Sequence, residues 1–283
     1  MHEKLATDST GPNTQPGQRK RSAAAYRVLG YALALAGVPM FLSAVLTPVG
    51  MALFAASYWS FRRARKHAAV LADDVLAKDT RAPILYLRSF DDEEQDNHPS
   101  AILNARHTNI AGSTPAWAPR EQDALAAVLA RIGPYVAIGK PGELLPELGA
   151  ARTYVSDAAW QAKIQEWLER AHLVILRAGA TQGLRWELSE LVRRIDPRRV
   201  LVILPTSPEH YSAFTKWANV VLPQKLPASQ PEERLVCFDE TWRSRTLPPR
   251  TGITKTLKPF FAQNGIELRS SFFKDFLEHN GLS

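Results

Sequence analysis

Two carboxylates near the start of a predicted helix are the first candidates for chemistry. Glu187 and Glu190 follow a short apolar segment, residues 173–176, and a turn of small residues, 178–183. An unbroken apolar segment of this length is typical of a strand buried on both faces of a parallel sheet. Open α/β sheets bind their ligands at the carboxyl ends of such strands, where these carboxylates would lie. The alternative is that each glutamate is a helix-terminal charge, favoured by the helix dipole.

A second polar group ends another apolar segment, residues 83–90. Its members are Arg88, Ser89, Phe90 and Asp91. An arginine at the end of a strand needs either an anionic ligand such as phosphate or an ion pair with Asp91, Asp92 or Glu187. The acidic run that follows lacks the spaced oxygen ligands of a calcium loop, so we expect a solvated loop and no metal site.

Five strand-and-helix units must position these two groups. The predicted strands are residues 83–90, 135–138, 173–176, 200–204 and 235–238. The predicted helices are residues 120–132, 158–171, 184–195, 207–218, 252–264 and 270–279. This alternation indicates an α/β fold with a parallel sheet and helices on both faces. It suits the flavodoxin-like strand order 2-1-3-4-5, in which strands one and three, and hence the two polar groups, are neighbours.

The segment after the second predicted strand contributes Arg152 and Tyr154, which we expect in a loop. There they would fold over a nucleotide. Alternatively, the ring of Tyr154 would pack against the loop itself. Asp157 is the expected N-cap of the following helix. Trp186, beside the two glutamates, is a further candidate for a substrate contact.

The N-terminal part of the chain predicts attachment to a membrane. Residues 1–22 are polar and predict a disordered tail, whereas residues 23–61 hold a single charged side chain, Arg27. A helix that spans a bilayer needs about 20 apolar residues. We therefore expect a transmembrane helical hairpin with two spans, about 25–46 and 48–61.

Basic residues flank this apolar region on both sides, at 19–21 and 62–66. Because lysine and arginine collect on the cytoplasmic side of membranes, a hairpin satisfies both clusters and a single span does not. We therefore expect an inner or plasma membrane protein whose N-terminus and C-terminal domain are cytoplasmic. Residues 62–81 would form a juxtamembrane linker or helix, and residues 82–283 the cytosolic domain.

Composition and motifs argue against several classes of protein. The net charge of +7 is concentrated in the two flanking clusters, so we expect a lipid bilayer and not nucleic acid as the partner. The single cysteine, Cys237, excludes a disulfide framework. The absence of a P-loop, of G-x-G-x-x-G and of G-x-S-x-G weighs against an NTPase, an ordinary dehydrogenase and a hydrolase triad.

Three features in this order resemble a Toll/interleukin-1 receptor (TIR) domain. Residues 86–92, Tyr-Leu-Arg-Ser-Phe-Asp-Asp, are similar in their order of apolar and polar residues to the first strand and acidic turn of that family. Pro141-Gly142 resembles a loop element after the family's second strand. Residues 186–191 fit its W-x-x-x-E-L motif. The likeness covers about residues 82–265.

The resemblance implies a divergent, membrane-anchored bacterial relative that binds NAD or a related nucleotide and cleaves the nicotinamide–ribose bond. NAD would be a substrate and not a cofactor, and no metal would be needed. Such cleavage passes through an oxocarbenium-like transition state that a carboxylate stabilises. The W-x-x-x-E match transfers this role to Glu190, while Glu187 is nearer the helix start and is the alternative. The acidic insertion after strand one and residues 149–154 depart from the family.

Two further hypotheses compete with this one. The first is a non-enzymatic, membrane-tethered module that signals by self-association, which would leave both glutamates exposed. The second is another flavodoxin-like enzyme that acts on a nucleotide or a sugar nucleotide. Whether Glu187, Glu190 and Arg88 lie together in one place is the observation that best separates these hypotheses.

Overall fold

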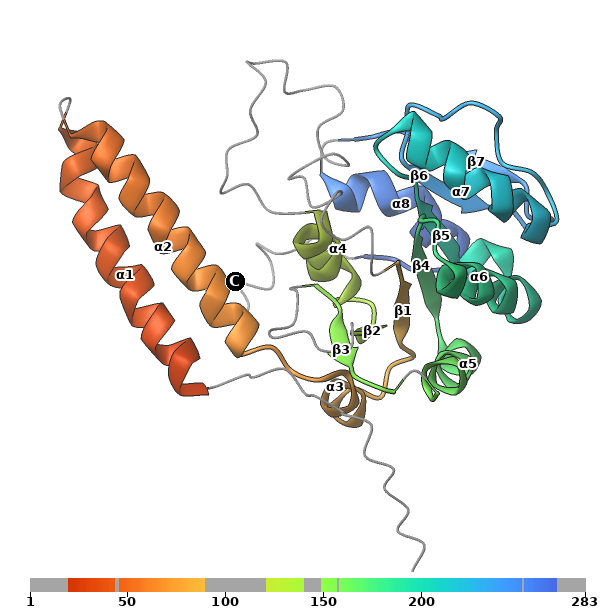
Figure 1. Ribbon diagram of the computed structural model, residues 1–283, viewed down its shortest axis with the longest axis horizontal. Helices are drawn as coiled ribbons and strands as arrows, with labels where there is room; N and C mark the ends of the chain where they lie inside the picture. Colours follow the sequence, from red (N-terminus) through yellow and green to blue (C-terminus); the bar gives the residue numbers. More distant parts are fainter. Residues whose placement is uncertain are drawn as a thin grey trace, which may run out of the picture.

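The computed structural model describes residues 20–43, 46–89, 121–139, 149–156, 158–250 and 252–268. Its centre is a mixed sheet of seven strands in the order β3-β2-β1-β4-β5-β6-β7, with helices on both faces (Figure 1). The strands are β1 (Ile84–Leu87), β2 (Tyr135–Ile138), β3 (Ala151–Thr153), β4 (Leu173–Arg177), β5 (Val200–Ile203), β6 (Leu235–Phe238) and β7 (Ser244–Thr246). The first five in chain order are parallel, β6 is antiparallel to β5, and β7 is antiparallel to β6.

The five predicted strands have the predicted neighbours, but the sheet is neither five-stranded nor wholly parallel. The chain after β5 and the following helix returns to the carboxyl end of β5, where the amide of Leu204 donates to the carbonyl of Arg234 (2.7 Å). The next strand, β6, therefore starts beside the end of β5 and runs in the opposite direction. Strands β3 and β7 were not predicted, because Ala-Arg-Thr and Ser-Arg-Thr carry no apolar run.

Helices cover both faces of the sheet, as the alternation predicted. Helices α4 (Glu121–Leu129) and α8 (Ile253–Gln263) pack on one face. The opposite face is covered by α3 (Ala72–Lys78), α5 (Trp160–Arg170), α6 (Gln182–Arg194) and α7 (Pro208–Val221). Successive strand residues alternate between the two cores: Leu85 and Leu87 face α5 and α6, whereas Ile84 and Tyr86 face α4 and α8. The central strands are thus buried on both faces, which explains their unbroken apolar sequences.

Two long helices, α1 (Lys20–Leu42) and α2 (Thr47–His67), form a hairpin that stands apart from the sheet (Figure 1). Their contact surfaces carry small residues seven positions apart: Ala23, Gly30 and Gly37 in α1, and Gly50, Ser57 and Ala64 in α2, all buried. The Ser57 hydroxyl donates to the carbonyl of Gly30 (2.7 Å). Close backbone approach through small residues and hydroxyls is typical of helices that pack in membranes.

The helices of the hairpin differ in length from the two predicted spans. Helix α1 ends at Leu42, before the predicted end of the first span, and α2 continues through the basic cluster to His67. Within the described part of the chain, only α1 is long and apolar enough to cross a membrane. The segment after α2, predicted as a linker or helix, contains the short helix α3.

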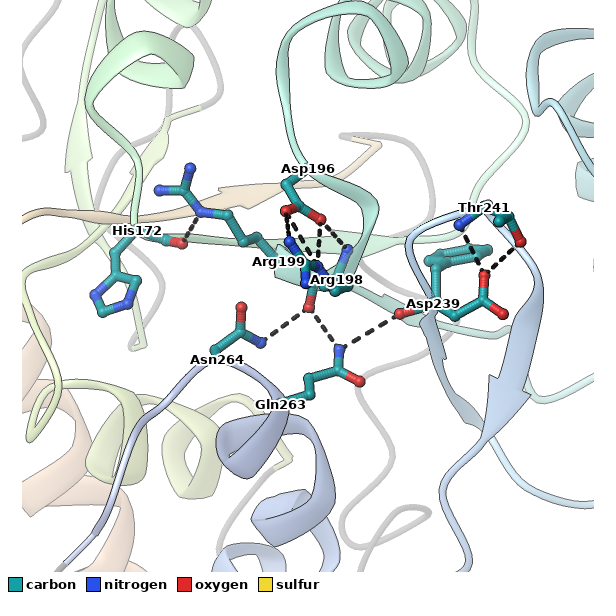
Figure 2. A network of polar contacts seen from close by, with 9 residues as sticks. His172, Asp196, Arg198, Arg199, Asp239, Thr241, Gln263 and Asn264 are labelled. Carbon is teal, nitrogen blue, oxygen red and sulfur yellow. Dashed lines mark hydrogen bonds and ion pairs between the residues drawn. The ribbon is translucent and has the colours of Figure 1, made fainter.

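A polar network ties the chain together at the amino ends of β4 and β5, far from the carboxyl ends of these strands (Figure 2). The Arg199 guanidinium donates to the carbonyl of His172 (2.7 Å). The side-chain amides of Gln263 and Asn264 donate to the carbonyl of Arg198 (2.6 and 2.9 Å). These bonds use side chains to satisfy backbone carbonyls and attach the end of α8 to the start of β5. The network therefore serves the fold.

Candidate functional site

Two buried arginines occupy neighbouring positions at the carboxyl ends of the central strands β1 and β4. Leu87 pairs with Leu176 in the parallel register, so Arg88 and Arg177 are the next residues of neighbouring strands. Their side chains are 6% exposed each, and Ser89 beside them is also buried. Sequence reasoning singled out Arg88 but missed Arg177. The signal was present, since both strands read as an apolar run that ends in arginine.

Glu187, in the second turn of α6, brings a carboxyl group to Arg88. Helix α6 starts after the N-cap Thr181, whose hydroxyl accepts a hydrogen bond from the amide of Leu184 (3.4 Å). Glu187 is 9% exposed, and burial raises the pKa of its carboxyl group to about 8, while the charge of Arg88 acts in the opposite direction. The neutral form therefore predominates at pH 7. Within the described residues, its Oε2 has no hydrogen-bond partner.

Glu190, one turn further along α6, has a different environment. Its carboxylate accepts hydrogen bonds from Gln165 of α5 (2.9 Å), Arg193 (3.0 Å) and Arg194 (2.9 Å). The hydrogen bond from Gln165 and the two arginines lower the pKa of Glu190 against the opposing effect of burial. Glu190 is therefore a carboxylate at neutral pH whose oxygens already have donors, and it lies against α5.

Trp186 also contacts α5. Its ring packs edge-on against Trp160, with ring centroids 4.9 Å apart. Trp186 is half-buried, whereas Glu187 and Glu190 are buried although they lie off the apolar stripe of Leu184, Leu188 and Leu191.

Arg152 is in strand β3 and not in the predicted loop. It pairs with Ala137 of β2, and its side chain is buried at the edge of the sheet. Tyr154 follows the end of β3 and packs directly against Gly139 at the end of β2, since a Cβ on that glycine would lie 2.3 Å from Tyr154 Cε1. Glycine is thus required at this position by a close approach.

Other predicted features lie outside the described residues. These are Phe90, Asp91 and the acidic segment to residue 119, the Pro141-Gly142 element, Asp157 and the last predicted helix. Within the described part of the chain, no group of three or more His, Cys, Asp or Glu side chains could hold a metal ion. The candidate site therefore consists of Arg88, Ser89, Arg177 and Glu187, with Tyr154 at the end of the edge strand.

The fold and this site define an α/β protein with a mixed sheet and a polar cluster at the carboxyl ends of its central parallel strands. Comparisons with protein-family models, with curated proteins and with solved structures found no match to the chain. The residues of the site are therefore the basis for a proposed function.

Proposed function

We propose that this protein is membrane-anchored and that its α/β domain binds NAD, or a related nucleotide, and cleaves it at the nicotinamide–ribose bond. One observation carries the proposal: the buried carboxyl group of Glu187 lies within the electrostatic influence of Arg88 at the ends of β1 and β4. From this pair of strands the sheet extends through β2 on one side and β5 on the other. Open α/β sheets bind nucleotides at such a switch point. The TIR resemblance supplies the substrate class.

The reaction needs a negative charge beside the sugar and positive charges beside the phosphates. Water attacks C1′ of the ribose, the bond from C1′ to the nicotinamide nitrogen breaks, and its electron pair neutralises the nicotinamide ring while the water loses a proton. Positive charge develops on the ribose in the transition state, where a carboxylate stabilises it. Arg88 and Arg177 carry the planar guanidinium groups that bind phosphate oxygens.

The surroundings of the two glutamates favour Glu187 for this role over Glu190. The oxygens of Glu190 are engaged by Gln165, Arg193 and Arg194, which leaves less negative charge for a substrate. Glu187 is buried and close to the strand ends. Because its pKa is raised to about 8, its charged form increases as the pH rises. Nicotinamide release should therefore increase as the pH rises through about 8 and level off only above that value.

The full chain in lipid nanodiscs, incubated with NAD and assayed for released nicotinamide, tests the proposal. Glu187→Gln removes the charge but keeps the shape, and we expect it to lower the rate by about 10²–10³-fold. Glu190→Gln is the matched control on the same helix and should retain activity close to that of the natural chain. Equal activity of the natural chain and Glu187→Gln, or no release by either, would contradict the proposal.

The α1–α2 hairpin is the proposed membrane anchor. Apolar side chains on its surface are exposed, among them Leu35 (77%) and Leu42 (80%). Basic residues gather where the hairpin joins the rest of the chain, at Arg63, Arg65 and Lys66. Basic clusters beside an apolar segment suit the anionic surface of a cytoplasmic leaflet. The N-terminus and the α/β domain would both be cytoplasmic.

A non-enzymatic module that signals by self-association is the second candidate. The half-buried pair of Trp160 and Trp186 on neighbouring helices favours it, because aromatic residues at a surface often anchor interfaces. This candidate predicts that Trp186→Ala abolishes self-association of the detergent-solubilised chain in sedimentation, with no nicotinamide release by any variant. Against it, Glu187 and Glu190 are buried and not exposed.

A further inference from the structure

The hairpin of α1 and α2 has exposed apolar side chains that extend to its tip. Val28, Leu35 and Leu42 of α1 are 69%, 77% and 80% exposed, and Met51 of α2 is 58% exposed. The buried residues of the hairpin are instead small ones between the two helices, together with Arg62. An apolar surface of this extent in a folded chain marks contact with a partner or a membrane.

Basic residues limit this apolar surface at one level on both helices. The apolar part of α1 begins after Arg27, and that of α2 ends before Arg62. Contacts between the helices show that these positions lie side by side: the Arg63 guanidinium lies 5.7 Å from the centroid of the Tyr26 ring, and Tyr31 packs edge-on against Phe61.

Aromatic residues gather at the same level. Tyr26 stacks on His67, and Tyr31 and Trp59 are 69% and 55% exposed. Tyrosine and tryptophan prefer the interface between hydrocarbon and water, and lysine and arginine prefer the headgroup region beyond it. The structure therefore marks one membrane interface, at the end of the hairpin that joins the rest of the chain.

The tip of the hairpin has no corresponding polar boundary. Residues 41–50 contain no charged side chain. The Thr47 hydroxyl donates to the carbonyl of Ser43 (2.8 Å) and lies within hydrogen-bond distance of the carbonyl of Phe41 (3.3 Å). The amide of Ser43 donates to the carbonyl of Met40 (3.3 Å), and Pro48 at the start of α2 has no N–H group. These groups, among the described residues of the turn, are thus satisfied internally, which is what a lipid environment demands.

Helix α1 as a whole has the length and composition of a membrane-spanning helix. The uncharged part of each helix, however, is too short for a full crossing. Each helix has about 15 residues between its basic boundary and the turn, and these rise about 22 Å. The hydrocarbon core of a typical bilayer is about 30 Å thick. A full crossing would leave about 8 Å of the far leaflet's hydrocarbon unspanned, or would draw the exposed Arg27 and Arg63 into hydrocarbon.

From these observations we infer that the hairpin enters the bilayer from the side that holds the α/β domain and that its tip stays in the hydrocarbon of the far leaflet. The inference rests on the membrane attachment included in the proposed function and replaces the two full spans expected from the sequence. Its ligand is a phospholipid bilayer with anionic headgroups, which complement the basic residues at the interface.

Cysteine accessibility in vesicles tests this inference with the full chain. Cys237 is buried and is first replaced by serine. Single cysteines are then placed at the tip, Ser43→Cys, and beyond the basic end of α2, Ala68→Cys. The chain is reconstituted in vesicles of phosphatidylcholine and phosphatidylglycerol, with a charged maleimide in both aqueous compartments. Reagent on both sides makes the result independent of the direction of insertion.

We expect Ala68→Cys to react rapidly and Ser43→Cys to react more than about tenfold more slowly until detergent is added. In vesicles of short-chain lipids, with a hydrocarbon core of about 20 Å, the Ser43→Cys thiol should become reactive. Equal reaction of both cysteines in the thicker vesicles, or no change in the thinner ones, would overturn the inference.

Flotation of the vesicles separates this result from the wider proposal. A chain that does not float with the vesicles contradicts membrane attachment itself. A chain that floats but whose tip reacts contradicts only the depth of the tip. Leu46→Cys provides a second position at the tip in case Ser43→Cys disturbs the turn. Nicotinamide release is measured independently of both.

Discussion

Replacement of Glu187 by glutamine should stabilise the protein, increasingly so as the pH rises. The Glu187 carboxyl group is 9% exposed, and its pKa in the folded protein is about 8, compared with 4.5 for an unperturbed glutamate. Burial is the dominant cause, because a charged carboxylate loses its water and the charge of Arg88 does not make up for this loss. Glutamine has nearly the same shape and remains neutral at every pH.

The size of the effect follows from proton linkage. Above its unfolded pKa the group is ionised in the unfolded chain but still protonated in the folded one, so folding is progressively disfavoured as the pH rises. The loss is complete once the pH exceeds the folded value of about 8. Between about pH 5 and pH 9, this one group lowers the free energy of unfolding of the natural chain by about 4 kcal/mol relative to Glu187→Gln.

Urea unfolding of the full chain in detergent micelles, followed by tryptophan fluorescence from pH 5 to pH 9, measures this difference. At the acid end the natural chain and Glu187→Gln should have similar midpoints, and at the alkaline end the variant should unfold at clearly higher urea. If the two curves stay parallel over the whole range, the folded-state carboxyl group of Glu187 is not protonated at neutral pH. That result would contradict the raised pKa of Glu187 and burial as its cause.

Three further variants test other parts of the structure. Gly139→Ala should destabilise the chain by about 1–3 kcal/mol in the same urea assay, since its Cβ would lie 2.3 Å from the Tyr154 ring. Glu190→Gln should destabilise it by about 0.5–1 kcal/mol at pH 7 through loss of two ion pairs, an effect that disappears as the pH falls below the lowered pKa of this carboxylate. Gly50→Leu should separate the hairpin helices, because even a Cβ would lie 2.6 Å from the backbone nitrogen of Phe41; faster proteolysis within α1 and α2 would report it, and an unchanged rate would refute it.

The local sequence predicted strands β1, β2, β4, β5 and β6 and their order in the sheet. Apolar runs such as residues 173–176 and 200–204 have no polar face for solvent. Their composition therefore predicts strands that are buried between two layers of helices. The leucines of α6 at helical spacing likewise fixed the face that packs on the sheet. The apolar N-terminal region and its basic ends predicted a helical hairpin, and two helices are present there.

The direction of β6 and the existence of β3 depended on the tertiary structure. The direction of β6 depends on which end of β5 the connecting chain reaches before β6 begins. The sequence of residues 222–234 has no pattern that indicates this end. A three-residue strand such as β3 exists only because β2 offers it an edge. Arg152 accordingly lies in a strand, although its sequence looks like a loop.

In the candidate site, too, the sequence predicted some features and the tertiary structure decided others. The sequence identified Glu187 and Glu190 as carboxylates on one helix after a buried strand. The W-x-x-x-E resemblance put Glu190 first and Glu187 second, whereas the proposal from the structure reverses this order. Their difference arises from residues distant in sequence: Gln165 of α5 reaches Glu190, whereas the burial of Glu187 and the charge of Arg88 depend on the packing of α6 against the ends of β1 and β4. Desolvation and charge depend on distances in space, so only the folded chain decides which carboxyl group stays protonated at neutral pH.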